Sequence, residues 1–576
     1  MTQKTDSPVA FPPVVPLHLV PVFKTPFRAI LSEIGVLILD LTRSKFRRWI
    51  LILVGALLTV LIVNMVGQIY LNQWMGGFYR AIEQRNLPMI GDSITDFLML
   101  IALLLIVVVS QTYLHEQLKI RLREWLSGDL IKYWLTPGRA YRLNISADES
   151  INPDQRIQED VRNFCEMSTD LGVGLIQASL LLISFIGVLW SLSQNIYFQW
   201  AGQTLVIPGY MVWVALAYSG LGSFLTARVG RPLIALNEER YSREAAFRFS
   251  VVRVSENSES IAFYTGERDE GKVIFHHLSK VLNIMQQLAM ALVRLTFVTS
   301  GYGWIMIALP ILVALPGYLR GAFDLGGLMM VVGAFGQVQQ SLRWFVDNFS
   351  KIANWRAAMH RVVVFRNIVE TIDQYESDAG QIQIVSHPKG HLSFDNIKIS
   401  LIDGEVVIAD ATAYIQPGER VLIVGESGSG KSILFRATAG LWPWGSGTIM
   451  VPPRDQLMFL PQKPYMPLGT LADALAYPKP LSEVDRQMLV SALKEVNLAE
   501  FLSQLDRVER WDKLLSLGQQ QLFAFARLLI HRPAWVFLDE GTSALDDENH
   551  HRMMSLFKGD LAKTTVISIG HRPGLA

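Results

Sequence analysis

The sequence predicts an α-helical membrane domain followed by an α/β domain that binds a nucleotide. Half of the 576 residues are hydrophobic (50%), which is too apolar for two or three soluble domains of ordinary composition. Apolar stretches long enough to cross a bilayer recur up to about residue 345. Beyond them, Gly425 to Ser432 has the spacing of a phosphate-binding loop. A net charge of +1 without any basic tract excludes a nucleic-acid partner.

The first 27 residues contain six prolines and fit neither a helix nor a central strand, so we expect a flexible lead-in there. They also lack the cationic start and apolar core of a secretory signal, and we expect no cleaved signal peptide.

About six later stretches have the length and apolar character of membrane-spanning helices. They cover residues 49–70, 97–114, 173–192, 206–225, 292–315 and 328–345. The last two are less apolar, because Arg294 begins one and three glutamines interrupt the other. Buried helices of a large soluble protein would explain any one stretch, but hardly the whole set.

Basic residues predict the orientation of these spans. The connections after the second and fourth spans are long and rich in Lys and Arg, whereas the other connections are short. The positive-inside tendency places both long connections and both termini in the cytoplasm. Their mixed apolar and charged pattern indicates that the membrane helices continue beyond the bilayer.

The predicted domains are a membrane domain at residues 28–370, a linker at 371–390 and a nucleotide-binding domain at 391–576. In the last of these, strand-like runs at 392–399, 405–408, 420–424 and 535–538 alternate with helical stretches, as in α/β nucleotide domains.

The phosphate-binding loop predicts how ATP is held. Its glycines bring backbone N–H groups close to phosphate oxygens, Lys431 supplies a positive charge, and the Ser432 hydroxyl is suited to Mg²⁺. The residues expected to bind the nucleotide here are Gly425, Ser427, Gly428, Gly430, Lys431 and Ser432. The alternative is a Gly/Ser turn that binds nothing, which the flanking strand and helix patterns disfavour.

A second, acidic element follows the apolar run 535–538. Asp539 is expected to bind Mg²⁺, and Glu540 to polarise the attacking water. The alternative is a pair of acids that begins a solvated loop.

These elements resemble the motifs of ATP-binding-cassette (ABC) transporters. Residues 515–519 (LSLGQ) resemble the signature sequence, and residues 539–546 resemble the Walker B end and D-loop. Residues 459–462 (FLPQ) are similar to the Q-loop, and His571 matches the switch histidine. The resemblance implies an exporter-type membrane fold and ATP hydrolysis with Mg²⁺, in which Glu540, Gln462 and His571 act at the γ-phosphate. It also implies Asp539, Ser432 and Gln462 at the metal.

One set of spans and one nucleotide domain make the chain similar to a half-transporter that works as a homodimer. The resemblance then implies that Ser516 and Gly518 of one protomer cap the nucleotide bound by the other.

Two cytoplasmic motifs, at residues 152–160 and 257–267, resemble those of subfamily D transporters and of bacterial SbmA/BacA-like ATP-binding/permease proteins. We interpret them as contacts that relay nucleotide-domain closure to the membrane helices; a solvated helical surface is the alternative. The resemblance implies a multi-pass inner-membrane protein, in contact with lipid, that moves hydrophilic solutes such as peptides or cobalamin. Acyl-CoA or another lipid-like cargo, and a passive or ion-driven translocator with a regulatory cassette, are alternatives.

The sequence departs from the family pattern at three places. Leu517 replaces the usual signature glycine, Leu401 lies where an adenine-stacking aromatic is expected, and the chain ends soon after His571, which suggests an incomplete C-terminus. Polar residues inside the spans, such as Asn64, Gln68, Gln177 and Arg294, either line a hydrated cavity or join helices.

Overall fold

The computed structural model divides the chain into two compact units, and each is discontinuous in sequence. Of the described residues, those in 27–131 and 152–365 form the membrane unit, and those in 132–146 and 366–570 form the second unit. The structure describes residues 27–146, 152–194, 198–200, 203–205, 207–374, 381–387, 390–401, 405–426 and 428–570. The predicted N-terminal lead-in up to residue 26, residues 375–380 and 388–389 of the predicted linker, Ser427 and His571 therefore lie outside the described residues.

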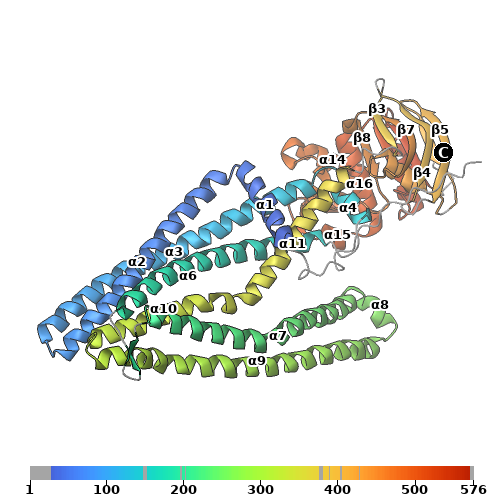
Figure 1. Ribbon diagram of the computed structural model, residues 1–576. Coiled ribbons are helices and arrows are strands. Elements are labelled where there is room, and N and C mark those ends of the chain that lie inside the picture. The colour runs from blue at the N-terminus through green and yellow to red at the C-terminus, as the bar shows by residue number, and fades with distance from the viewer. Residues whose placement is uncertain are drawn as a thin grey trace, which may run out of the picture. The chain divides into compact units, whose positions relative to one another are not determined.

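The membrane unit consists of long helices joined by short connections (Figure 1). In chain order these are α1 (Phe27–Arg43), α2 (Arg47–Glu83), α3 (Leu87–Trp134), α5 (Pro153–Gln155), α6 (Val161–Ser193), α7 (Tyr210–Glu256), α8 (Ser258–Phe263), α9 (Glu267–Leu319), α10 (Leu325–Asp347) and α11 (Phe349–Gln374). A π-helical turn, Arg156–Asp160, joins α5 to α6, and a hairpin of β1 (Phe198–Trp200) and β2 (Gln203–Leu205) precedes α7.

Five described helices are long and apolar enough to cross a membrane, namely α2, α3, the run from α5 to α6, α7 and α9. They contain the first, second, third and fifth predicted spans, and the fourth from Tyr210 onward. The sixth, 328–345, forms α10, which is not in this set because its glutamines lower its mean hydropathy. This helix instead supplies the centre of the bundle core, where Val331, Phe335 and Val338 are fully buried against α6 and α7.

Several helices extend far beyond the apolar stretches, as the sequence predicted. At about 1.5 Å per residue, the 53 residues of α9 span about 80 Å, well over twice the hydrocarbon core of a bilayer. Helices α7 and α9 run side by side along this length and are joined by α8 at their far end (Figure 1). Phe263 and Tyr264 at this end are 80% and 85% exposed.

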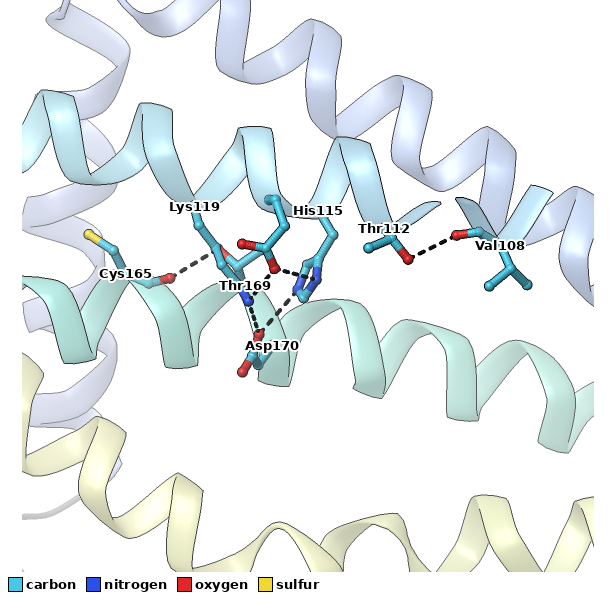
Figure 2. Close-up of polar contacts among 8 residues, drawn as sticks. Val108, Thr112, His115, Lys119, Cys165, Thr169 and Asp170 are labelled. Atoms are coloured by element: carbon cyan, nitrogen blue, oxygen red, sulfur yellow. Dashed lines mark hydrogen bonds and ion pairs between the residues drawn. The ribbon is translucent and has the colours of Figure 1, made fainter. Parts of the chain in front are cut away.

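Polar side chains join the spanning helices α2, α3 and α6. Asn64 donates to Gln111 at 3.0 Å, and Gln111 donates to Gln177 at 3.1 Å. Farther along the same helix pair, Lys119 and His115 of α3 point toward Asp170 of α6, at 2.9 and 3.2 Å (Figure 2). Of the two alternatives for intramembrane polar groups, Asn64 and Gln177 thus take the helix-to-helix role.

The first cytoplasmic motif contains a buried ion network. Asp160, at the end of the π-helical turn, is 2% exposed and accepts from Arg156 at 2.6 Å. Arg361 of α11 bonds both oxygens of the same carboxylate, at 2.6 to 3.0 Å. A buried carboxylate requires this kind of paired, hydrogen-bonded environment. The network therefore fixes the start of α6 against α11.

The second unit contains two four-stranded sheets. The strands of the parallel sheet lie in the order β6 (Arg420–Ile423), β12 (Thr565–Ile569), β11 (Trp535–Asp539), β8 (Leu457–Leu460). The other sheet has the order β3 (Gln383–Ser386), β7 (Gly445–Val451), β4 (Leu392–Ser400), β5 (Val406–Ile415). The strand-like runs predicted from the sequence overlap β4, β5, β6 and β11.

The helices of this unit surround the parallel sheet and form a second apolar core beside it. They are α12 (Lys431–Thr438), α13 (Leu471–Ala476), α14 (Arg486–Glu495), α15 (Trp511–Leu514), α16 (Leu517–His531) and α17 (Asp547–Leu556). A two-stranded pair of β9 (Gly469–Thr470) and β10 (Val508–Glu509) lies among them. Helix α16 is the centre of this core, and its residues Phe523, Phe525 and Leu528 are fully buried.

Two features were not predicted. Helix α1 occupies part of the region before the first span, and α4 (Arg139–Ser146), which lies between two membrane helices in sequence, belongs to the second unit. Ile145 of α4 packs against the core of the two sheets, and Tyr141 lies near Arg436 of α12. Burial raises the pKa of the Tyr141 hydroxyl, which Arg436 partly opposes. Helix α4 has only eight residues, which is too short to give a clear helical period in the sequence.

Candidate nucleotide site

The strand register brings the predicted site residues to one edge of the parallel sheet. Trp535 to Leu538 of β11 pair with Leu457 to Leu460 of β8, so Asp539 and Glu540 leave the sheet beside Gln462. Phe537 and Phe459 stack at 4.3 Å and hold the two strands in this register. Since the carboxyl ends of parallel strands meet at the same edge, the loop after β6 opens there too.

The loop between β6 and α12 has the backbone of a phosphate-binding loop. Gly428 and Gly430 have φ of +86° and +80°, in the region that favours glycine. A Cβ on Gly430 would also meet the Val407 side chain at 2.2 Å. Lys431 begins α12 and folds over the loop, donating to the carbonyl oxygens of Gly425 and Glu426 at 2.8 and 2.6 Å. Its ammonium therefore lies over the concave backbone that would receive phosphate.

Ser432 and Asp539 meet where a divalent cation is expected. The Ser432 hydroxyl donates to Asp539 Oδ1 at 3.0 Å across the sheet edge. Burial raises the pKa of the Asp539 carboxyl; Ser432 opposes this shift and the neighbouring Glu540 adds to it. A half-buried carboxylate that is costly to ionise, beside a hydroxyl oxygen, is a donor set that suits Mg²⁺ together with phosphate oxygens. The residues present therefore fit the metal, although the described residues contain no cluster of three or more acidic, His or Cys ligands.

Gln462 and Glu540 are in direct contact. The Gln462 amide donates to Glu540 Oε2 at 2.9 Å, and Glu540 has a φ of +50° that turns its side chain out of the strand direction. The Glu540 backbone is fixed by a bond from its N–H to the Ile569 carbonyl at 3.1 Å. The two residues assigned to water activation and phosphate sensing therefore share one hydrogen-bonded corner of the site.

The signature segment begins α16. Ser516 is its N-cap: its hydroxyl accepts from the Gln519 N–H at 3.2 Å, and the Gln519 side chain accepts from the Ser516 N–H at 3.0 Å. Gly518 lies against the D-loop so closely that a Cβ there would meet the Ala544 carbonyl oxygen at 2.9 Å. Leu517, which replaces the usual glycine, is 40% exposed. The hydrogen bonds recorded for Ser516 are local to its own helix.

Gln521 is a site residue that sequence reasoning missed. It is fully buried, donates to the Gln462 carbonyl at 2.9 Å and to the Ser543 hydroxyl at 3.3 Å, and accepts from the Ala544 N–H at 3.0 Å. It thus joins the Q-loop to the D-loop. The signal available in the sequence was the second of two glutamines that follow the signature, just before the largely apolar run that begins at Leu522.

A bundle of membrane-crossing helices combined with a phosphate-binding α/β unit defines an ATP-dependent membrane transporter. The comparisons agree: residues 39–314 match the model of ABC transporter transmembrane region 2, and residues 408–543 match that of the ABC transporter domain. A Synechocystis protein named as an uncharacterized ABC transporter ATP-binding protein is 32% identical over 95% of this chain and 82% of its own length. The chain belongs to the ABC transporter family.

Other relatives place the chain within that family. The inner membrane ABC transporter ATP-binding protein YddA of Escherichia coli is 28% identical over 88% of this chain and 89% of its own length. Human ATP-binding cassette sub-family D member 3 is 26% identical over 90% of this chain and 82% of its own. The predicted resemblance to subfamily D and bacterial half-transporters is therefore confirmed.

A solved bacterial Atm1-family ABC exporter with ATP bound has the same fold, with a TM-score of 0.72 at 18% identity over 92% of each chain. The exporter-type architecture predicted from the sequence is confirmed. The chain is a multi-pass membrane protein with a cytoplasmic, ATP-binding ABC domain, and it couples ATP hydrolysis to transport.

Proposed function

We propose that two copies of this chain form an ATP-driven transporter of hydrophilic solutes, such as peptides or cobalamin, in the inner membrane. The observation that supports a homodimer is that each chain has one phosphate-binding loop and one signature serine. The hydrogen bonds of Ser516 go to residues of its own helix, and none goes to the described residues of the phosphate-binding loop of the same chain. A second copy would supply Ser516 and Gly518 to the nucleotide held by Gly425, Lys431 and their neighbours.

In this mechanism the protein positions the reacting groups and neutralises the negative charge of the phosphates. Lys431 and the loop N–H groups bind the phosphates. Ser432, Asp539 and Gln462 would hold Mg²⁺. The metal would supply charge neutralisation between the phosphates. Glu540, fixed by Gln462, orients the attacking water and accepts its proton, and His571 contacts the γ-phosphate.

A small hollow in the membrane unit, with room for about one water molecule, has several polar side chains in its lining. It is lined from three helices by hydroxyl, amide and guanidinium groups, which are costly to place in a lipid-facing surface. The lining includes Ser219, Ser223, Tyr302, Gln339 and Arg343. Tyr302 lies flat on Tyr218 at 4.2 Å, and a Cβ on Gly222 would meet the Tyr302 ring at 2.4 Å, so the glycine makes room for it. The human relative's sub-family supports acyl-CoA or another lipid-like molecule as the alternative cargo.

Mg-dependent ATP hydrolysis by the purified chain in lipid tests the proposal. We expect Glu540→Gln to lower kcat by about a hundredfold or more while ATP still binds, and the exposed Glu483→Gln to have no effect. Peptides and cobalamin should stimulate turnover. Stimulation by acyl-CoA alone would select the lipid-like cargo, and nucleotide binding without turnover would select the regulatory cassette.

The dimer has its own test. The native Cys165 is buried, so cysteines placed at Ser429 and Leu517 would be the reactive ones. With ATP, a bifunctional thiol reagent should join two chains of the Ser429→Cys/Leu517→Cys variant and yield a species of twice the mass. Crosslinking within a single chain would contradict the proposed arrangement.

A further inference from the structure

The first helix of the described chain presents its apolar side away from the protein. Val36, Ile38 and Leu39 of α1 are 42%, 55% and 50% exposed, whereas Leu37 is 5% exposed. The acidic residues lie with Leu37 on the inner side, where Glu33 pairs with His360 of α11 at 2.9 Å and Asp40 is half-buried. A helix at a water-facing surface has the reverse arrangement, with charges outward and apolar side chains inward.

Four cations follow directly at the junction of α1 and α2. Arg43, Lys45, Arg47 and Arg48 are all exposed and form no ion pair among the described residues. Some basic residues elsewhere in the membrane unit are paired: Arg121 with Glu124, Arg243 with Glu239 and Lys272 with Asp269. Within the described part of the chain, the junction is therefore a concentrated positive charge that takes part in no ion pair.

The junction lies at the cytoplasmic surface of the membrane. Helices α2 and α3 form an antiparallel pair of spans, and α3 leads into residues 132–151, which belong to the cytoplasmic ABC unit. The start of α2 is therefore on the cytoplasmic side. Trp49, Leu51 and Ile52, the next residues of α2, are 65%, 60% and 61% exposed, as expected for a helix that enters lipid with an aromatic residue at the interface.

We propose that the outer side of α1 and the cluster Arg43, Lys45, Arg47 and Arg48 form a binding surface for anionic phospholipid of the cytoplasmic leaflet. The apolar side chains insert at the boundary between headgroups and acyl chains, and the cations bind the lipid phosphates. Charge complementarity selects this occupant over a second copy of the chain, whose matching surface would bring the same positive cluster against itself. The surface is independent of the transported cargo.

The test measures lipid contact at α1 in the full-length protein reconstituted in nanodiscs. A fluorescent probe is attached to Ile38→Cys, and quenching is compared for phosphatidylglycerol and phosphatidylcholine that carry a doxyl group near the headgroup at equal mole fraction. We expect both lipids to quench, with a preference for phosphatidylglycerol on the order of threefold. The preference should shrink in high salt, because exposed charges are screened.

Two charge-neutralised variants provide the contrast. Changing Arg43, Lys45, Arg47 and Arg48 to Gln should remove the preference but leave the quenching by phosphatidylcholine. Changing Arg248, Arg253, Arg268 and Lys272, which are equally exposed at the far end of the α7 and α9 pair, should preserve it. Thermal unfolding of both variants confirms that they fold.

Three outcomes would overturn the proposal. Equal quenching by the two lipids in the unmodified sequence would show that the cations select no headgroup. Absence of quenching by either lipid would show that protein, such as a second copy, covers α1. Loss of the preference when millimolar inorganic phosphate is added would show that the cluster binds free phosphate instead of a lipid surface.

Discussion

The side chain of Gln521 connects the carbonyl oxygen of Gln462, at 2.9 Å, to the N–H of Ala544, at 3.0 Å. One buried amide therefore positions both the Q-loop, which holds Glu540, and the D-loop, which packs against the signature glycine. The side chain that couples these loops belongs to α16, the helix that also carries the signature at its start.

Replacing Gln521 by Met should slow ATP hydrolysis. The substitution keeps the volume and removes the hydrogen bonds, so that Gln462 and Ala544 lose their common partner and Glu540 is less well oriented. We expect kcat to fall by about tenfold with little change in KM, because positioning acts on the chemical step.

The neighbouring Gln520→Met is the matched control. Gln520 is also buried, but its bonds go to the carbonyls of Asp512 and Leu515. Both substitutions should lower Tm by a similar amount, since each removes buried hydrogen bonds worth about 1 kcal/mol apiece. An equal loss of kcat in the two variants would show that Gln521 has only a structural role.

Gly518→Ala should impair the site through the backbone. The added Cβ would lie 2.9 Å from the Ala544 carbonyl oxygen, and a main-chain atom in a packed loop cannot move far to avoid it. The D-loop and the start of α16 are expected to move apart, which should lower the ATPase rate several-fold. In Gly559→Ala the nearest atom is 3.9 Å away, so its rate should equal that of the unmodified chain.

Asp539→Asn should stabilise the protein at neutral pH when no divalent cation is present. Burial raises the pKa of Asp539, so above that pKa its ionised form favours the unfolded chain. As the pH falls through the raised folded pKa, the carboxyl becomes neutral and this penalty disappears. The gain in Tm over the unmodified chain should therefore shrink as the pH decreases toward the ordinary aspartate range near about 4.

Thermal unfolding in a chelator at several pH values measures this gain. With Mg²⁺ and ATP the order should reverse, because only the carboxylate provides a charged metal ligand. A variant less stable than the unmodified chain at pH 7 in chelator would contradict the prediction.

Asp160→Asn should destabilise the membrane unit. The substitution removes the negative charge that Asp160 places against the buried Arg156, and it weakens the bonds of Arg361 to the start of α6. Breaking a buried ion pair costs about 3 to 5 kcal/mol, so a clear decrease in Tm is expected. Asp347→Asn, which breaks the exposed pair with Arg343, should change Tm little.

Sequence reasoning predicted those parts of the protein that have local signals. The phosphate-binding loop, the acidic strand end and the long apolar spans are contiguous patterns, and the structure has a helix or strand at each. The contact of Ser432 with Asp539, 107 residues apart, was anticipated only because both motifs were assigned to Mg²⁺.

Contacts without a local signal were missed. Gln521 is one polar residue in a helix, and its function depends on two loops that the strand register brings beside it. Helix α4 is short, and its packing against the core of the second unit depends on residues far away in the sequence. Among intramembrane polar groups, the sequence could not indicate that Asn64 and Gln177 would each find Gln111.

The length of α9 has a mechanical consequence. A continuous rod of 53 residues behaves as a lever, so a rotation of only one degree about one end displaces the other by about 1.4 Å. Packing against the antiparallel helix α7 resists bending of α9. Small angular changes at the cytoplasmic end therefore become displacements as large as a bond length at the membrane. In such a lever, stiffness is as much a requirement of transport as any side chain in the pathway.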